Sequence, residues 1–215
     1  MQSGGISFNK TLSKPVIVLM GDSNGSMYGV ALKEIATDMG AKVHVISVSA
    51  GDPFPETKLY RDSLLFLKHE KPDITIFVAE WVGKIGNNHG RLTTALSEIL
   101  LNSKHVILIA QPPNLPDDAS REGIRQSGEH PIFEKTAFSN IRKQTNAFLV
   151  SLHNDRLHVL SVDTLFVKPN GEIRFTNEQG KQLYQDADHL SGYGSMMVKK
   201  LLQVEIAQIM TSLRL

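Results

Sequence analysis

The sequence predicts an α/β fold: a three-layer α/β/α sandwich around a mainly parallel, roughly five-stranded sheet. Short apolar runs alternate along the chain with stretches whose apolar residues recur at helical spacing, and turn residues separate the two kinds of segment. Strands that alternate with helices form parallel sheets covered on both faces. The length of 215 residues suits one domain, and the sequence contains no internal repeat.

Five apolar runs have the length of strands. The first ends at Gly21, which is typical of a buried strand that enters a tight turn. The predicted strands are Pro15–Met20, Val43–Val48, Ile74–Ala79, Val106–Ala110 and Leu157–Val162.

Helical spacing follows the strands. Apolar residues at this spacing predict helices over 32–39, 59–67, 92–100, 136–153 and 191–209. Gly40 is the expected stop of the first helix, and Ser191 is the expected cap of the last. The proline-rich polar segment 111–131 predicts a long surface loop, and Asn170-Gly171 predicts a small hairpin turn.

Composition excludes several function classes. The chain has 23 basic and 22 acidic residues and a net charge of +1, so nothing marks it for nucleic acid or an anionic membrane, and a small or neutral ligand is expected. It has no cysteine, which removes disulfides, thiolate metal sites and cysteine nucleophiles. Its apolar runs are too short to span a membrane, so we expect the chain as written to be soluble.

The first residues carry no signal-peptide pattern. Met1–Gly5 lacks a basic segment followed by an apolar one. We therefore interpret residues 1–13 as a linker or an artificial chain start, and residues 14–215 as the catalytic domain.

The turn after the first predicted strand contains Gly21-Asp22-Ser23. In open α/β sheets the ligand crevice lies outside the carboxyl ends of the strands. The glycine permits a sharp turn, and the following helix directs backbone N–H groups at the serine hydroxyl. This placement suits a nucleophile that faces an oxyanion, although a Gly-Asp-Ser tripeptide can also be a simple turn with a helix cap.

A second polar cluster, Asp186-Ala187-Asp188-His189, precedes the last predicted helix. Serine needs a base, and the base needs a third group to fix its tautomer and orientation. Asp186, three residues before His189, could reach the near ring nitrogen and leave the far nitrogen for Ser23. Asp188 is a rival, but a residue adjacent in sequence usually points away from its neighbour. Without Ser23, the cluster would be read as a cap with solvated charges.

These two blocks together resemble the SGNH or GDSL hydrolase superfamily. The segment Asn177–Ser191 is more narrowly similar to the end of SGNH domains fused to acyltransferase-3 type membrane proteins, which O-acetylate bacterial surface carbohydrates. The resemblance extends from about Val16 to about Met210, with specific motifs only at the two ends. It implies a catalytic triad of Ser23, Asp186 and His189.

The superfamily normally adds a glycine and an asparagine to the oxyanion hole. Gly51 fits the glycine position, although it could equally be a turn glycine. The asparagine block is missing, because the third strand runs into Ala79-Glu80-Trp81 instead, as in the fused domains. Asn87 and Asn88 come several residues late and are interpreted as polar loop residues.

Trp81 is the only tryptophan, and it could stack on a sugar ring or fill the core at a strand end, of which packing is the preferred interpretation. The remaining histidines show no pair at metal-ligand spacing on one helix, so no metal is predicted.

The resemblance implies an acetyl-enzyme on Ser23 whose acetyl group passes to a carbohydrate hydroxyl or to water. It implies no cofactor in this domain, an acetyl donor that derives its group from acetyl-CoA through a separate membrane acyltransferase domain of the same full-length chain, and a periplasmic or extracytoplasmic location as part of a membrane protein. Two alternatives stay open: a freestanding carbohydrate esterase or lipase-like hydrolase of the same superfamily, and a glycan-binding domain that keeps the fold without catalysis.

Overall fold

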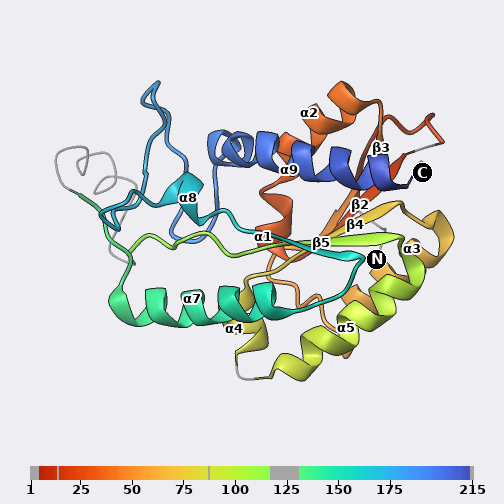
Figure 1. The fold of residues 1–215 in the computed structure, drawn as a ribbon, viewed down its shortest axis with the longest axis horizontal. Helices are drawn as coiled ribbons and strands as arrows, with labels where there is room; N and C mark the ends of the chain where they lie inside the picture. Colours follow the sequence, from red (N-terminus) through yellow and green to blue (C-terminus); the bar gives the residue numbers. More distant parts are fainter. Residues whose placement is uncertain (1–4, 14, 87, 117–130, 214–215) are drawn as a thin grey trace.

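The protein is described from a computed structural model. It describes residues 5–13, 15–86, 88–116 and 131–213. These residues form one six-stranded sheet in the order β1-β3-β2-β4-β5-β6, with helices on both faces (Figure 1). The predicted three-layer α/β/α sandwich is therefore confirmed.

The five predicted strands all form, and each differs from its predicted bounds by two residues at most. The sheet is parallel across β3, β2, β4, β5 and β6. Their bounds are β2 (Val16–Gly21), β3 (Lys42–Ser47), β4 (Ile74–Val78), β5 (His105–Ile109) and β6 (Leu157–Leu160).

The sixth strand, β1 (Ile6–Phe8), was not predicted, and it lies in the segment 1–13 that the sequence analysis left outside the domain. It pairs antiparallel with β3, so that Ile6 faces Val45 and Phe8 faces Val43. Ile6 is 61% exposed. A three-residue edge strand with an exposed apolar residue has no pattern that sequence reasoning could separate from a linker.

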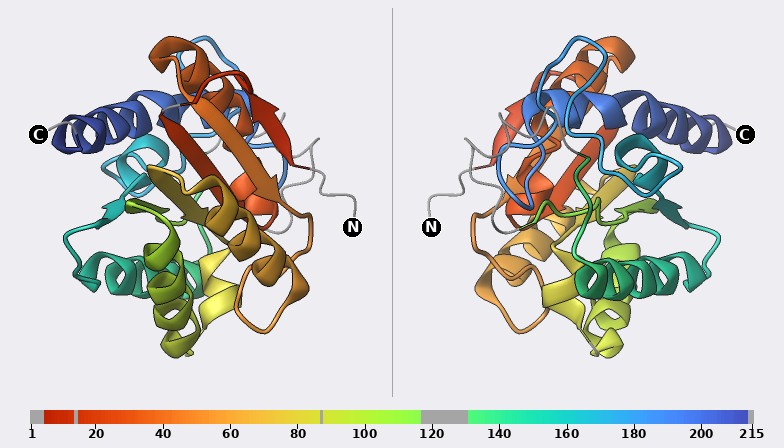
Figure 2. Two further views of the ribbon diagram at one scale, coloured as in Figure 1. Left: turned by 90° about the vertical axis from the view of Figure 1, so that its right-hand side faces the viewer. Right: turned by 90° about the vertical axis from the view of Figure 1, so that its left-hand side faces the viewer.

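The helices form two layers, one on each face of the sheet. Helices α2 and α9 pack together against one face, with apolar residues such as Ile17 and Leu19 beneath them. On the opposite face α3, α5 and α7 cover residues such as Val18 and Phe77 (Figures 1 and 2). The bounds are α1 (Ser23–Ser26), α2 (Gly29–Met39), α3 (Lys58–Glu70), α4 (Trp81–Ile85), α5 (His89–Asn102), α7 (Thr136–Ser151), α8 (Asp163–Phe166) and α9 (Gly192–Ser212).

Local signals set the helix ends as predicted. Gly40 ends α2 in the left-handed conformation, with φ of 60°. The Ser191 side chain accepts hydrogen bonds from the N–H groups of Tyr193 and Gly194 and so caps α9. Among the described residues, no helix combines the length and apolarity that crossing a membrane requires.

The connections after β5 and α8 position the site. Residues 111–116 leave β5 without regular structure, and the rest of the predicted loop up to residue 130 lies outside the described residues. The predicted turn at Asn170-Gly171 forms: Val167 bridges Ile173, and Gly171 has φ of 87°.

The strand order places the end of β2 near the centre of the carboxyl edge of the sheet. β2 lies between β3 and β4, so the chain leaves β2 towards one side of the sheet and later returns to the other side. A crevice outside the carboxyl ends of the strands is expected at such a switch in direction. The residues that follow β2 are therefore the first place to look for a site.

Candidate active site

Ser23 lies directly outside the central strand. It is the first residue of α1, which begins after the N-cap Asp22, and its side chain is partly exposed. The N–H of a first helical residue has no acceptor within its helix. Ser23 thus presents both a hydroxyl and a backbone donor at the carboxyl edge of the sheet.

Only glycine fits at position 21, because the neighbouring strand leaves no room for a side chain. A Cβ atom on Gly21 would lie 1.9 Å from the carbonyl oxygen of Val78 on the neighbouring strand. Such a separation is far below any non-bonded contact, so the two central strands could not pair at this register with a larger residue. The glycine allows the chain to turn while β2 and β4 remain hydrogen-bonded.

The buried side chain of Asp22 holds the turn after β2 in place. One of its carboxylate oxygens accepts a hydrogen bond from the Asn24 N–H at 2.9 Å, and the other accepts from the Glu80 N–H at 2.8 Å. The residue is 2% exposed, and burial is the main cause that raises the pKa of this carboxyl. The carboxylate therefore ties the turn after β2 to the turn after β4.

His189 and Asp186 lie in contact on one turn, as the sequence predicts. Nδ1 of His189 lies 2.8 and 3.0 Å from the two carboxylate oxygens of Asp186. Oδ1 of Asp186 also accepts hydrogen bonds from the backbone N–H groups of Asp188, at 3.1 Å, and His189, at 2.8 Å. One carboxylate thus holds both the backbone and the imidazole of the turn.

The expectation that Asp188 points away from the imidazole was wrong. Oδ1 of Asp188 lies 3.2 Å from Nδ1 of His189, because the tight turn around Asp186 brings both carboxylates to the same ring nitrogen. The hydrogen bond that His189 donates to Asp188, followed by that to Asp186, raises the pKa of His189 to about 9 against the opposing effect of burial. Asp186 has the shorter contact, and Asp188 is a second partner.

The two turns dock against each other. The Leu190 N–H, next to His189, donates to Sδ of Met27 at 3.3 Å, and the Ala31 N–H donates to Oγ of Ser195 at 3.1 Å. Nε2 of His189 is shielded from solvent and makes no hydrogen bond to any described residue. The imidazole thus keeps its far nitrogen free, and the next residue, Leu190, contacts Met27 at the end of the helix that begins with Ser23.

Gly51 does not offer the donor that its predicted role needs. Its N–H donates to the carbonyl oxygen of Val48 at 3.0 Å, and a Cβ atom would lie 2.6 Å from Leu59. The turn interpretation is therefore the one that the geometry supports. Asn88 is an exposed residue before α5, and Asn87 lies outside the described residues.

Trp81 is a packing residue and not a sugar platform. It is fully buried, its indole N–H donates to the Ile109 carbonyl at 2.8 Å, and its ring meets Phe77 edge-on. Trp81 is the first residue of α4, and its burial leaves no face of the indole at the surface. Packing was the preferred interpretation of the sequence.

The sequence did not predict a polar contact between two strand ends, made by Glu80 after β4 and Gln111 after β5. Gln111, after β5, donates from Nε2 to Glu80 at 3.0 Å and accepts the Val82 N–H at Oε1, also at 3.0 Å. Its backbone exchanges two hydrogen bonds with the Asn146 side chain. The signal was available, since Glu80 and Gln111 each follow a predicted strand, but amide and carboxylate residues there are common in loops.

Three potential metal ligands gather within the described residues. Asp186, Asp188 and His189 each offer an atom within 4.8 Å of the others. Both carboxylates already share Nδ1 of His189, which suits an orienting role.

The geometry so far gives an α/β/α sandwich with Ser23 at the carboxyl edge of the sheet and a carboxylate-bound histidine on a turn before α9, and comparison with known proteins specifies the family. Residues 4–203 match the family described as the SGNH domain fused to AT3 domains. The chain belongs to this family. A comparison with curated proteins gave no significant match.

Solved structures share the fold. The periplasmic domain of a lipopolysaccharide acetyltransferase from Salmonella ser. Paratyphi A is similar at a TM-score of 0.74 and 14% identity, over 90% of this chain and 84% of that one. The catalytic domain of the Streptococcus pneumoniae peptidoglycan O-acetyltransferase A has a TM-score of 0.51 and 13% identity, over 91% and 94%. A family 3 carbohydrate esterase from Clostridium thermocellum has a TM-score of 0.51 and 14% identity, over 91% and 97%. Family and fold together support an enzyme of O-acetyl transfer or ester hydrolysis.

Proposed function

We propose that the chain transfers an acetyl group through an acyl-enzyme on Ser23, with His189 as the base and Asp186 as the group that orients it. The observation that supports the proposal is the imidazole of His189, whose Nδ1 is held by carboxylates and whose shielded Nε2 has no described partner, while the adjacent Leu190 bonds to Met27 after α1. A base in this state is oriented, and it accepts a proton when the imidazole is neutral.

In the proposed mechanism, Nε2 of neutral His189 takes the proton of the Ser23 hydroxyl as Oγ attacks the carbonyl carbon of an acetyl ester. The Ser23 N–H donates to the oxyanion that forms. Nε2 returns the proton to the departing oxygen, and the acetyl group remains on Oγ. In the second half, Nε2 deprotonates the acceptor hydroxyl, which takes the acetyl group and frees the serine.

The acceptor we propose is a hydroxyl of a bacterial surface carbohydrate. A membrane acyltransferase domain in the same full-length protein supplies the acetyl group. Membership of a family fused to AT3 domains supports this arrangement. It also supports an extracytoplasmic location, and the similar Salmonella domain is periplasmic. The domain itself needs no cofactor for the proposed steps, because serine, histidine and aspartate supply the nucleophile and the proton transfers.

Water is a second acceptor. The side chain of Asp186 is 49% exposed, so solvent reaches the edge of the site. An acetyl-enzyme without a carbohydrate would hydrolyse, and esterase activity on simple acetyl esters is the assay that follows.

The test compares Ser23→Ala with Ser26→Ala. Both serines lie on α1, and Ser26 is exposed with its hydroxyl bonded to the Ser23 carbonyl at 2.7 Å. We expect Ser23→Ala to lose labelling by a fluorophosphonate probe and about 10⁴-fold or more of the aryl acetate turnover, while Ser26→Ala keeps both. Labelling and turnover that survive in Ser23→Ala would refute the assignment and favour a binding domain without catalysis.

A further inference from the structure

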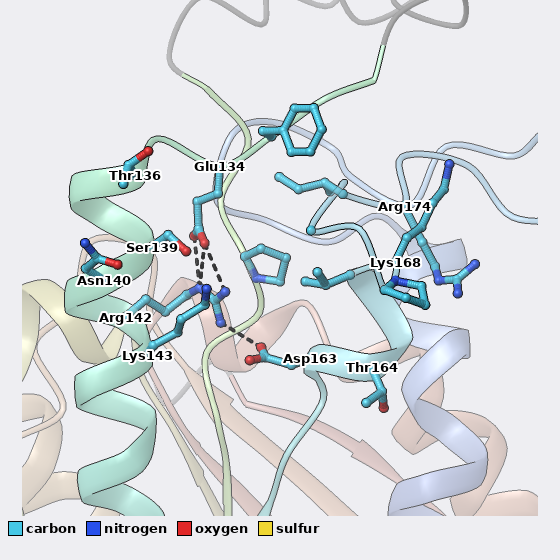
Figure 3. A pocket seen from close by; sticks show the side chains of 16 residues that line it. Glu134, Thr136, Ser139, Asn140, Arg142, Lys143, Asp163, Thr164, Lys168 and Arg174 are labelled. Atoms are coloured by element: carbon cyan, nitrogen blue, oxygen red, sulfur yellow. Dashed lines mark hydrogen bonds and ion pairs between the residues drawn. The ribbon is translucent and has the colours of Figure 1, made fainter.

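A large hollow lies apart from the Ser23 turn on the same edge of the sheet. Its volume is about 690 Å³, and one wall is the first half of α7 while the other is α8 with the hairpin that follows it (Figure 3). Pro113, after β5, and Asp163, after β6, both line it. Neither Ser23 nor His189 does.

The floor of the hollow is an internally satisfied charge cluster. The guanidinium of Arg142, 1% exposed, binds Glu134 with a shortest contact of 2.9 Å and Asp163 at 2.6 Å (Figure 3). These charges hold the two walls together and need no ligand. Lys168, on the hairpin, is similarly engaged by Glu172.

Two cations on opposite walls form no close ion pair, although Arg174, after Lys168, also lowers the pKa of the Glu172 carboxyl. Lys143 on α7 and Arg174 at the end of the hairpin line the hollow, and neither forms an ion pair with a described residue. The chain as a whole is nearly neutral, so this local arrangement is invisible in the composition. An anionic group placed between the walls would find two partners for its charge.

Uncharged polar groups complete the lining. Thr136, Ser139, Asn140 and Thr164 have side chains that make no hydrogen bond to a described residue. The first three recur on one face of α7 together with Lys143, as the helical repeat requires. Phe133, which also lines the hollow, is 49% exposed and offers an aromatic face. Free hydroxyl and amide groups beside an aromatic ring match the hydroxyl-rich edges and apolar faces of sugars.

We infer that this hollow is a subsite for the acceptor carbohydrate and that it selects a sugar unit carrying a carboxylate or a phosphate. The inference rests on the proposed function, since it names the class of acceptor. β6 lies three strand positions from β2, or about 15 Å at the usual spacing, so an oligosaccharide of a few units could occupy the hollow and still reach Ser23.

The test measures binding with defined sugars. Tetragalacturonate and its fully methyl-esterified form have the same backbone and differ in charge, and glucose 6-phosphate carries the alternative anion. We expect tetragalacturonate or glucose 6-phosphate to bind in calorimetry, with an affinity that falls as the salt concentration rises from about 0.02 M to about 0.3 M. The methyl ester should bind about 10-fold or more weakly. The better of the two anions identifies the source of the charge.

Variants locate the binding. Arg174→Gln and Lys143→Gln should each weaken binding of the anionic sugar about 5-fold, and the pair about 25-fold, while Arg174→Lys recovers part of the loss. Lys200→Ala, an exposed cation on α9, is the matched control and should bind as the parent protein does. Thermal melting of each variant checks that it is folded.

Binding in a Ser23→Ala background separates this inference from the proposed function, because the subsite does not require the nucleophile. Equal affinity for the methyl ester, unchanged binding in the double variant, or no binding of either anion would overturn the subsite and leave the Ser23 mechanism standing. Retained binding alongside unimpaired turnover in Ser23→Ala would overturn the mechanism alone.

Discussion

The nucleophile turn (21–26), which carries the proposed nucleophile, and the histidine turn (186–189) are held in place in different ways. The turn of Gly21 to Ser26 is anchored in the core, although Ser23 and Ser26 reach the surface: Asp22 is 2% exposed, and its carboxylate accepts a hydrogen bond from the Glu80 N–H at the neighbouring strand end. The turn of Asp186 to His189 lies at the surface, where the Asp186 and Asp188 side chains are 49% and 39% exposed. Its hydrogen bonds are local except that the Ala187 carbonyl accepts from the Leu115 N–H at 2.8 Å. The first turn is positioned by the core, and the second is largely positioned by its own sequence.

This difference predicts which property each substitution changes. Substitutions in the nucleophile turn should act on stability as well as on catalysis, because the same contacts hold the sheet. Above about pH 9, where the imidazole is neutral and its charge no longer stabilises the fold, substitutions in the histidine turn should act on catalysis and leave stability nearly unchanged, since surface ion pairs contribute about 0–1 kcal/mol.

The largest effect is expected for Gly21→Ala. The new Cβ would lie 1.9 Å from the Val78 carbonyl, so β2 and β4 must separate, and we expect a loss of about 3 kcal/mol or more in the free energy of unfolding. Gly29→Ala is the control, because a Cβ there meets nothing within 4 Å. Denaturant unfolding measures both, and equal stability of the two variants would show that the strands yield at this point.

Asp186→Asn should separate activity from stability. The amide keeps an oxygen for the backbone of the turn but loses the charge that holds the imidazole, and we expect kcat/KM on an aryl acetate to fall about 10² to 10⁴-fold at the alkaline plateau. The melting temperature should hardly move. Asp188→Asn, with the longer contact to Nδ1, should cost about 10-fold, and the reverse ranking would assign the orienting role to Asp188.

Asp22→Ala should have the opposite profile in the nucleophile turn. It leaves the N–H groups of Asn24 and Glu80 without their acceptor in a buried place, and we expect about 2 kcal/mol of destabilisation. Chemical denaturation of this variant beside Asp186→Asn tests the comparison directly. A stability within about 0.5 kcal/mol of the parent protein would mean that the core does not hold this turn through Asp22.

The smallest effect is a shift in pH dependence. An ordinary cleft predicts a rise in activity centred at about 6.5 to 7.5, but the second carboxylate at Nδ1 raises the pKa of His189 to about 9. The imidazole must be neutral to act as a base, so kcat/KM should rise with pH and level off above that value. The same raised pKa stabilises the fold fully below about pH 6.5, and this contribution fades as pH rises through about 9.

Asp188→Asn provides the check, because loss of this hydrogen bond should lower the midpoint. Rates between about pH 6 and pH 10, corrected for uncatalysed hydrolysis, measure it. A parent midpoint near 6.5 that does not respond to Asp188→Asn would remove the second carboxylate from the site.

The sequence predicted the sheet and helices well because their apolar spacing is strong. It also placed Asp186 beside His189 correctly, since a contact over three residues depends on local geometry. It could not reveal that the Gly51 N–H donates to the Val48 carbonyl or that the Asp188 side chain points towards His189, because both depend on the path of a short turn. The Glu80–Gln111 contact joins residues 31 apart, and no periodic pattern encodes such a pair.

The distance along the chain between the two turns has a consequence for folding. The Asp186–His189 pair can form within one turn, whereas the contacts of Leu190 with Met27 and of Ala31 with Ser195 close loops of 163 and 164 residues. Closing such loops is entropically costly, and contacts of this range slow folding. During refolding, esterase activity should therefore return only when α9 docks on α2, later than helix formation, so that the recovery of activity reports the meeting of the two ends of the domain.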